Sequence, residues 1–114
     1  METPVQISFH NMDTSPALEA EIRERVAKLE QFYDRITSCR VVFDAPHQHK
    51  HHGKRYQLRI DLALPDGAEI VVDRAHDKNG AQEDPHVAIR DSFQGAERQL
   101  KAFAAQHRRD ARRP

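Results

Sequence analysis

Alternation of apolar and polar residues with a period of two, or a β-like composition, predicts four strands along the chain. The segments concerned are residues 5–9, 39–43, 56–64 and 69–73. The last two are separated by Pro65-Asp66-Gly67, a turn sequence in which proline presets its φ angle and glycine accepts a positive one. We therefore expect these last two strands to pair as a hairpin.

Two apolar stripes at helical spacing predict two helices, and each stripe is preceded by the same start signal. A capping residue stands directly before a proline at Ser15-Pro16 and again at Asp84-Pro85. Proline is well tolerated at the first helical position because its missing N–H would be unpaired there anyway. The spacing predicts a first helix of about six turns. The two stripes consist of Leu18, Ile22, Val26, Leu29, Tyr33 and Ile36, and of Ile89, Phe93, Ala96, Leu100 and Phe103.

The resulting element order, β-α-β-β-β-α, predicts an α+β fold. Two helices with one apolar stripe each should pack on one face of a four-stranded, mostly antiparallel sheet, a two-layer sandwich like that of the double-stranded-RNA-binding domain. The 114 residues fit one domain and contain no internal repeat or interdomain linker. We assign residues 1–106 to this domain. Residues 107–114 are expected to form a basic tail that frays, because the tail has no apolar face.

The composition describes a soluble, polar protein with 38% hydrophobic and 32% charged residues. No apolar run approaches the roughly 18–20 residues that a membrane span needs, and the N-terminus lacks the basic and apolar regions of a secretion signal. The single cysteine, Cys39, excludes an intramolecular disulfide, fits a reducing cytosol and is expected to be a buried structural thiol. These features predict a cytoplasmic location without a membrane partner.

The formal net charge is zero, with 18 basic and 18 acidic residues, but the charges are unevenly distributed. Residues 1–38 sum to −3, residues 39–59 to +4, residues 60–97 to −6 and residues 98–114 to +5. Blocks this unequal can form a strongly positive face, so overall neutrality does not exclude a nucleic-acid partner. We expect a polarised surface, with most acids of residues 61–91 away from the basic side.

Basic residues follow one flank of each apolar stripe when the helices are drawn at roughly 100° per residue. Cations on a rigid element, spaced along a polyanion, are what phosphate recognition requires. The pattern also fits a solvated face with ion pairs one turn apart, such as Glu97 with Lys101, and both interpretations stay open. The basic residues concerned are Arg25, Lys28 and Arg35 on the first helix and Arg90, Lys101 and Arg108 on the second, with Arg98 and Arg109 nearby.

A histidine-rich segment, residues 46–55, lies between the second and third predicted strands. If this segment is extended, alternate imidazoles point the same way and could hold Zn²⁺, Ni²⁺ or Cu²⁺. No carboxylate or thiolate accompanies them, and the neighbouring Lys50, Lys54 and Arg55 repel a metal ion. A solvated loop, or histidines placed near phosphates, are the other interpretations. The candidate metal ligands are His47, His49, His51 and His52.

The pattern predicts no catalysis. The four glycines are scattered and form no phosphate-binding loop, no carboxylate pair stands out, and no histidine and acid are placed beside Cys39. We therefore predict a protein that is not an enzyme and that uses neither a cofactor nor a small-molecule substrate.

Three segments of the chain resemble one protein family. Residues 27–36, Ala-Lys-Leu-Glu-Gln-Phe-Tyr-Asp-Arg-Ile, closely resemble the end of the first helix in the family of ribosome hibernation promoting factor and ribosome-associated inhibitor A, also called sigma-54 modulation proteins. Residues 5–9 resemble the first strand of that family, and residues 84–100 resemble its second helix. The resemblance covers nearly the whole chain and is to the short members.

The resemblance implies a cytoplasmic bacterial protein that binds 16S rRNA of the small ribosomal subunit, in 30S or 70S particles, in the channel of mRNA and tRNA. Such a factor blocks translation by occupancy and preserves idle ribosomes under stress, and a monomer is expected. The alternatives are a general double-stranded-RNA-binding module and a metal-binding protein that uses the histidine-rich segment. From the resemblance and the charge pattern together, the candidate RNA-binding residues are Arg25, Lys28, Arg35, Lys54, Arg55, Arg90, Arg98, Lys101, Arg108 and Arg109.

Overall fold

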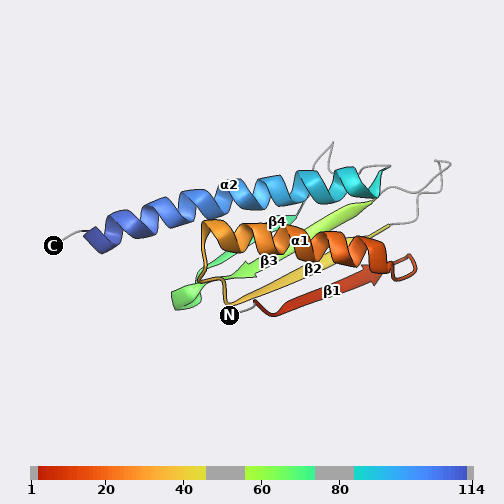
Figure 1. Ribbon diagram of the computed structural model, residues 1–114, viewed down its shortest axis with the longest axis horizontal. Coiled ribbons are helices and arrows are strands. Elements are labelled where there is room, and N and C mark those ends of the chain that lie inside the picture. Colours follow the sequence, from red (N-terminus) through yellow and green to blue (C-terminus); the bar gives the residue numbers. More distant parts are fainter. Residues whose placement is uncertain (1–2, 46–55, 74–83, 113–114) are drawn as a thin grey trace.

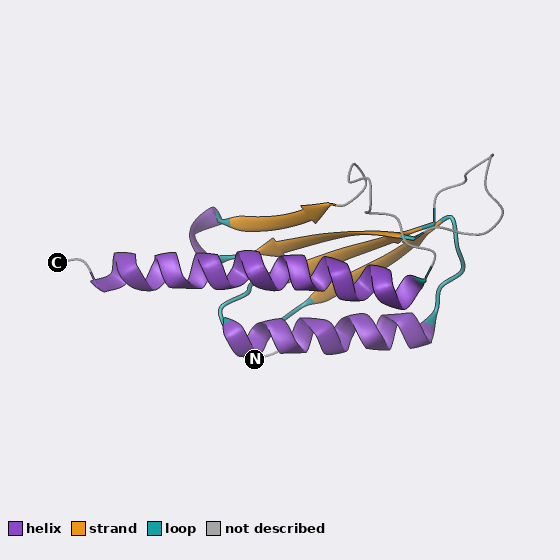
Figure 2. Cartoon of the chain, turned by 90° about the horizontal axis from the view of Figure 1, so that it is seen from above, coloured by secondary structure: helices purple, strands orange, loops and turns teal. Residues whose placement is uncertain are grey.

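Two helices cover one face of a four-stranded sheet in the computed structural model of the chain (Figures 1 and 2). The structure describes residues 3–45, 56–73 and 84–112, with side chains through residue 106. The elements, in chain order, are β1 (Val5–His10), α1 (Pro16–Phe32), β2 (Ser38–Asp44), β3 (Gln57–Ala63), a 3₁₀ turn (Pro65–Gly67), β4 (Glu69–Asp73) and α2 (Pro85–Arg112).

The sheet has the strand order β1-β2-β3-β4, so neighbours in the sequence are also neighbours in space. β1 and β2 are parallel, because α1 carries the chain back to the end where β1 begins, whereas the other two strand pairs are antiparallel. This arrangement confirms the predicted fold class. The predicted hairpin turn is also present, since Asp66 and Gly67 both adopt positive φ angles, of 63° and 77°.

The core lies between the helices and the inner face of the sheet. Val41, Phe43, Ile60 and Leu62 of the two central strands are fully buried and face the helices. Cys39 is buried beside them, and this burial, with smaller contributions from Asp61 and Glu30, raises the pKa of its thiol to about 12. A thiol with this pKa stays protonated at neutral pH and is a poor nucleophile, in agreement with the structural role predicted for it.

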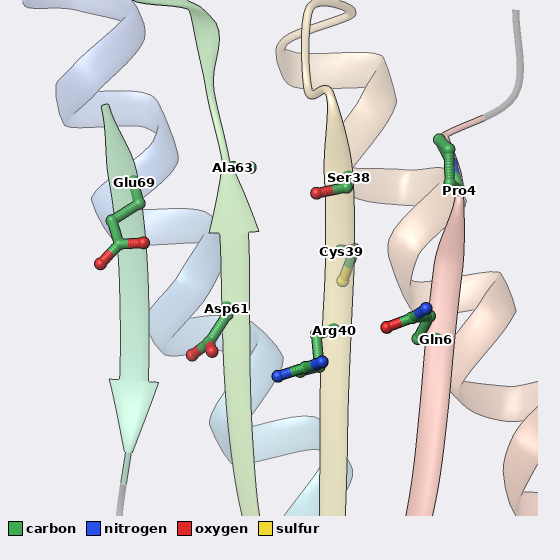
Figure 3. A pocket seen from close by; sticks show the side chains of 8 residues that line it. All are labelled: Pro4, Gln6, Ser38, Cys39, Arg40, Asp61, Ala63 and Glu69. Atoms are coloured by element: carbon green, nitrogen blue, oxygen red, sulfur yellow. The ribbon is translucent and has the colours of Figure 1, made fainter. Parts of the chain in front are cut away.

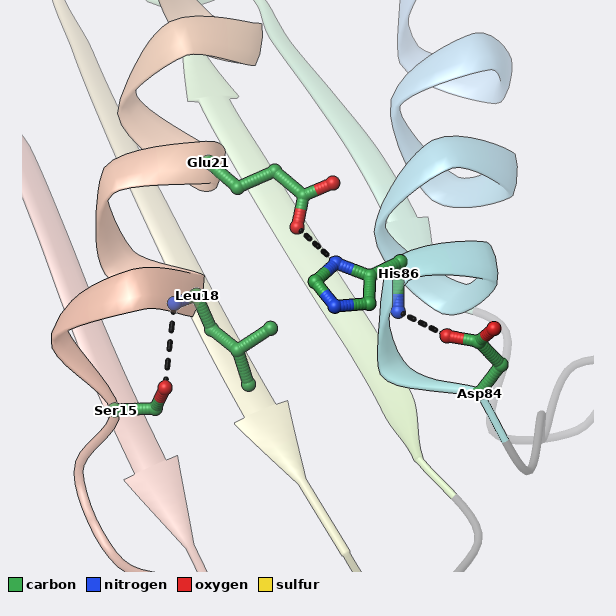
Figure 4. Close-up of polar contacts among 5 residues, drawn as sticks. All are labelled: Ser15, Leu18, Glu21, Asp84 and His86. Atoms are coloured by element: carbon green, nitrogen blue, oxygen red, sulfur yellow. Dashed lines mark hydrogen bonds and ion pairs between the residues drawn. The ribbon is translucent and has the colours of Figure 1, made fainter.

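Both helices begin at the predicted capping residues (Figure 4). The backbone N–H of Leu18 donates to Ser15 Oγ over 3.2 Å at the start of α1, and the N–H of His86 donates to Asp84 Oδ1 over 2.8 Å at the start of α2. Each cap satisfies one of the N–H groups that a helix N-terminus leaves without an intrahelical partner. Serine or aspartate before proline therefore marked both helix starts correctly.

The first helix is shorter than the six turns that its apolar stripe predicts. It has 17 residues and ends at Phe32, because Tyr33 adopts an extended conformation with φ −155° and ψ 107°. Ile36 nevertheless reaches the core, with 6% of its surface exposed, from the turn that leads into β2. An apolar residue in a return turn can thus continue a helical spacing without being helical. Arg35, placed on a helix flank by the sequence, lies beyond the end of α1.

The second helix is longer than the sequence predicts. α2 has 28 residues and continues through Arg112, so residues 107–112 of the predicted tail are helical, and Figure 1 shows the helix extending beyond the sheet. Residues 102–112 contain neither glycine nor proline and are rich in alanine and arginine. These are strong helix formers, and adding a residue to an existing helix is favourable even without an apolar face.

Candidate nucleic-acid interface

α1 and α2 lie side by side and run in the same direction (Figure 1). Near their starts, Glu21 of α1 contacts His86 of α2. Near the end of α1, Phe32 contacts Lys101 of α2. The flank of α1 that carries its basic residues therefore faces the flank of α2 that carries the other basic residues, and the two flanks form one surface.

A groove of about 290 Å³ lies between these two flanks. Its apolar part comes from Leu29 and Phe93, which are buried, and from the exposed ring of Phe32. Polar and charged side chains of both helices complete its lining. These are Arg25, Lys28 and Gln31 of α1 and Gln94 and Glu97 of α2.

The cations of this surface differ in how they are paired. Within the part of the chain that the structure describes, Arg25, Lys28 and Arg98 have no acidic partner within 4 Å. Lys101 Nζ lies 3.2 Å from Glu97 Oε1, and Arg90 Nε lies 3.3 Å from Asp91 Oδ1. Arg25 and Lys28 thus offer unneutralised charge inside the groove, as a site for phosphate requires.

The structure brings together only some of the residues that the sequence nominates. Arg25, Lys28 and Lys101 meet at the groove, while Arg90 and Arg98 are exposed on α2. Arg35 is exposed in a hollow that is also lined by Thr3 and Pro65, apart from the groove residues. The other nominated residues cannot be placed as side chains. Arg108 and Arg109 lie on the helical backbone of α2, and Lys54, Arg55, His47, His49, His51 and His52 lie outside the described residues.

Comparison with known proteins identifies the family. Residues 5–108 match the family described as Sigma 54 modulation protein / S30EA ribosomal protein. The chain belongs to this family. The match covers the four described strands, α1, and α2 through residue 108, and it confirms the resemblance seen in the sequence.

Individual members of the Sigma 54 modulation protein / S30EA ribosomal protein family and related structures agree with the assignment. The chain is 31% identical over 86 residues to the ribosome hibernation promoting factor of Azotobacter vinelandii, covering 75% of this chain and 67% of that protein. A ribosomal subunit interface protein from Coxiella burnetii has a similar structure, with TM-score 0.72, 17% identity, and coverage of 90% of this chain and 99% of that one. The N-terminal domain of Thermus thermophilus Protein Y also has a similar structure, with TM-score 0.69 and 20% identity. The match covers 89% of this chain and 99% of that domain. These two likenesses show the fold.

Phe32 is a groove residue that the sequence pattern did not single out. Phe32 is 44% exposed and is the one large hydrophobic side chain classed as exposed among the described residues. Its helical spacing indicates this position. Phe32 follows Lys28 by four residues and Arg25 by seven, so the three side chains share one helix flank. Phe32 lies off the apolar stripe of the helix.

A histidine–carboxylate contact joins the starts of the two helices at one end of the surface (Figure 4). His86 Nδ1 lies 2.7 Å from Glu21 Oε2. This hydrogen bond and the charge of Glu21 raise the pKa of His86 above its usual range, and Asp84 adds to the effect, while desolvation opposes it. The contact is therefore an ion pair only while the imidazole is protonated.

We expect the His86–Glu21 contact to stabilise the fold most at acidic pH. A raised pKa means that its contribution is fully present below the unfolded-state pKa of about 6.5 and is lost as pH rises through the folded-state value. The measurement is an NMR titration of the His86 ring, assigned by comparison with His86→Asn. Glu21→Gln should lower the pKa of His86 toward its ordinary value. An identical pKa in both proteins would show that the contact is not formed in solution.

The opposite face of the sheet carries acidic and basic side chains together (Figure 3). A shallow hollow of about 360 Å³ there is lined by Arg40, Asp61 and Glu69, together with Gln6 and neighbouring residues. Asp61 is paired with Arg59 over 3.1 Å, and a contact of 3.5 Å joins Arg59 to another acid of this face, Asp73. Three acids of the segment predicted to lie away from the basic side are thus on the face that the helices do not cover. Asp84 and Asp91 of the same segment belong to the helix side, so the described charges are only partly segregated.

The described residues offer neither a cluster of metal ligands nor a membrane-spanning helix. Among the described residues, no group of three or more histidine, cysteine, aspartate or glutamate side chains could hold a metal ion. The histidine-rich segment lies outside the described residues, so its metal site stays a prediction. Neither of the two described helices has a stretch long and apolar enough to cross a bilayer.

Proposed function

We propose that this chain is a ribosome-associated translation inhibitor of the hibernation type, which binds 16S rRNA in the mRNA and tRNA channel of the small subunit. The observation that carries the proposal is the groove, where the basic flanks of α1 and α2 meet and Arg25 and Lys28 are left without acidic partners among the described residues. Family membership supports it, as does the likeness to a ribosome hibernation promoting factor.

The proposed action follows from the physical properties of this surface. Two parallel helices hold the cations at fixed spacing, so phosphates of a folded RNA can be contacted without reordering the protein backbone. Inhibition then results from occupancy: a bound factor excludes mRNA and tRNA from the channel, and no chemical step is needed. We place the protein in the cytoplasm, where idle 30S and 70S particles are its partners, and propose that it binds as a monomer.

We expect the protein to co-sediment with purified 30S and 70S particles, and the binding to weaken steeply with salt. If Arg25, Lys28, Arg98 and Lys101 each neutralise a phosphate, the logarithm of the association constant should fall with the logarithm of salt concentration with a slope of about −3 or steeper. The measurement is a sedimentation or filter-binding series from low to high salt. A salt-independent affinity would contradict a phosphate-dominated interface.

The same assay separates the proposal from the alternative of a general double-stranded-RNA-binding module. That alternative predicts equal or tighter binding to a free RNA duplex of about 16 base pairs, the span that such modules cover. The ribosome proposal predicts much weaker binding to the duplex than to the particles. Absence of particle binding at low salt would remove the proposal altogether.

A further inference from the structure

The ring of Phe32 stands at the end of the helix groove in a setting unlike that of an ordinary exposed apolar residue. Single exposed hydrophobic side chains are normal on protein surfaces, so its 44% exposure by itself indicates nothing. Its neighbours are informative. Lys101 Nζ lies 4.5 Å from the centre of the ring, and Lys28 and Gln31 line the same groove. An exposed aromatic ring thus has one cation over it and borders a groove that carries further cations, amides and the paired carboxylate of Glu97.

Such a ring can bind an aromatic partner face to face while the cations bind a phosphate beside it. We infer that Phe32 stacks against an unpaired nucleobase of the bound RNA, with Lys101 and Lys28 contacting the phosphates next to that base. The inference rests on the proposed function and extends it from backbone contacts to one base. Stacking on aromatic side chains is a general means of holding single-stranded nucleic acid and tolerates every base, because each has a π-face.

The properties of the groove favour a nucleobase over an apolar side chain of a protein partner. The groove holds about 290 Å³, close to the lower limit of small-molecule sites, which suits one nucleotide. Its lining carries Arg25, Lys28, the amide of Gln94 and the carboxylate of Glu97, which is paired with Lys101. An apolar peptide side chain would leave Arg25, Lys28 and Gln94 desolvated and unpaired. A nucleotide satisfies them, because its phosphate accepts from the cations and its base edge can hydrogen-bond to the amide.

The inference also restricts the form of the RNA. Bases inside a duplex are stacked on each other and present only their edges, so a protein ring reaches a base face only in a loop, a bulge or a single strand. The phosphate contacts of Arg25 and Lys28 carry no such restriction. Loss of the ring should therefore reduce binding to an unpaired base and leave binding to a duplex unchanged.

The test compares the wild type with Phe32→Leu, which removes the π-face, and with Phe32→Tyr, which keeps it. Gln99→Ala, an exposed amide of α2 outside the groove lining, is the matched control. Each protein is titrated with 30S particles and with a single-stranded RNA of about eight nucleotides that carries 2-aminopurine at its centre. We expect Phe32→Leu to bind both targets about tenfold more weakly and to lose the fluorescence quenching of the stacked base. Phe32→Tyr and Gln99→Ala should match the wild type.

The outcomes distinguish this inference from the proposed function. If Phe32→Leu binds particles and oligonucleotide as tightly as the wild type, the base contact is overturned while the proposed function stands. If the variant loses affinity for particles but keeps wild-type affinity and quenching with the oligonucleotide, the ring contacts a ribosomal protein and the inference is again overturned. If the wild type binds the oligonucleotide through the ring but binds no particle, the proposed function fails and the base site stands.

Discussion

Reversing the charge of both unpaired groove cations, by Arg25→Glu with Lys28→Glu, is expected to lower the affinity for 30S particles at least 100-fold. Each charge-assisted hydrogen bond to a phosphate contributes about 1.5–3 kcal/mol, so the loss of two such contacts alone amounts to about 3 kcal/mol or more. The new carboxylates also repel the RNA backbone. Both side chains lie in the groove without acidic partners among the described residues, so no folded-state ion pair described in the structure is broken.

The expected stability of this double variant is close to that of the wild type. Neither side chain belongs to the buried core, and new repulsion between carboxylates one helical turn apart costs about 0.5 kcal/mol per pair. The matched control is Arg23→Glu with Arg40→Glu, which changes the net charge equally. Arg23 is exposed on the other flank of α1, and Arg40 lies on the uncovered face of the sheet. If both double variants lose the same affinity, binding depends on net charge and the groove is not the site.

Truncation of Phe43 to alanine is expected to cost about 3–5 kcal/mol of the free energy of unfolding. Phe43 is fully buried in β2, one of the two central strands, with its ring centre 5.8 Å from that of Phe9 and 5.6 Å from that of Tyr56. Removal of the ring leaves a cavity between sheet and helices and deletes both ring contacts. Since small domains are stable by only about 5–15 kcal/mol, the variant should be marginally folded.

The measurement for Phe43→Ala is denaturant unfolding together with thermal melting. At about 4 °C per kcal/mol for a domain of this size, the melting temperature should fall by about 12–20 °C. Val42→Ala is the matched control, because Val42 is the next residue of the same strand but faces away from the helices and is only partly buried. Its cost should stay below about 1.5 kcal/mol. Equal costs for the two variants would mean that the core does not lie between the sheet and the helices.

The two expected results separate binding from folding in a protein whose formal net charge is zero. Affinity should depend on a few cations on the helix face, whereas stability should depend on apolar side chains between the layers. Net charge predicts neither property. Asp61, Glu69 and Asp73 lie on the face opposite the helices, and Arg25 and Lys28 lie in the helix groove. The position of the charges relative to the sheet decides which face can approach a polyanion.

Local sequence signals determined much of the fold. Ser15-Pro16 and Asp84-Pro85 marked both helix starts, because a capping side chain and a proline act on their own backbone within one turn. Alternation and the Pro65-Asp66-Gly67 turn likewise marked the hairpin of β3 and β4. The flank positions of Arg25 and Lys28 followed from helix geometry alone. These features depend on residues close in sequence, so periodicity and turn chemistry suffice to predict them.

Tertiary structure decided the features that depend on distant residues. The apolar spacing continues to Ile36, although α1 ends at Phe32. Ile36 is buried because the turn that leads into β2 brings it to the core. The groove exists only because α1 and α2 pack in parallel on one sheet face, which turns two separate basic flanks into one surface and places Lys101 over Phe32. The sequence by itself thus determined the elements and which residues each flank carries. Which flanks face each other was settled by packing, because contacts between helices over 50 residues apart leave no local periodic signal.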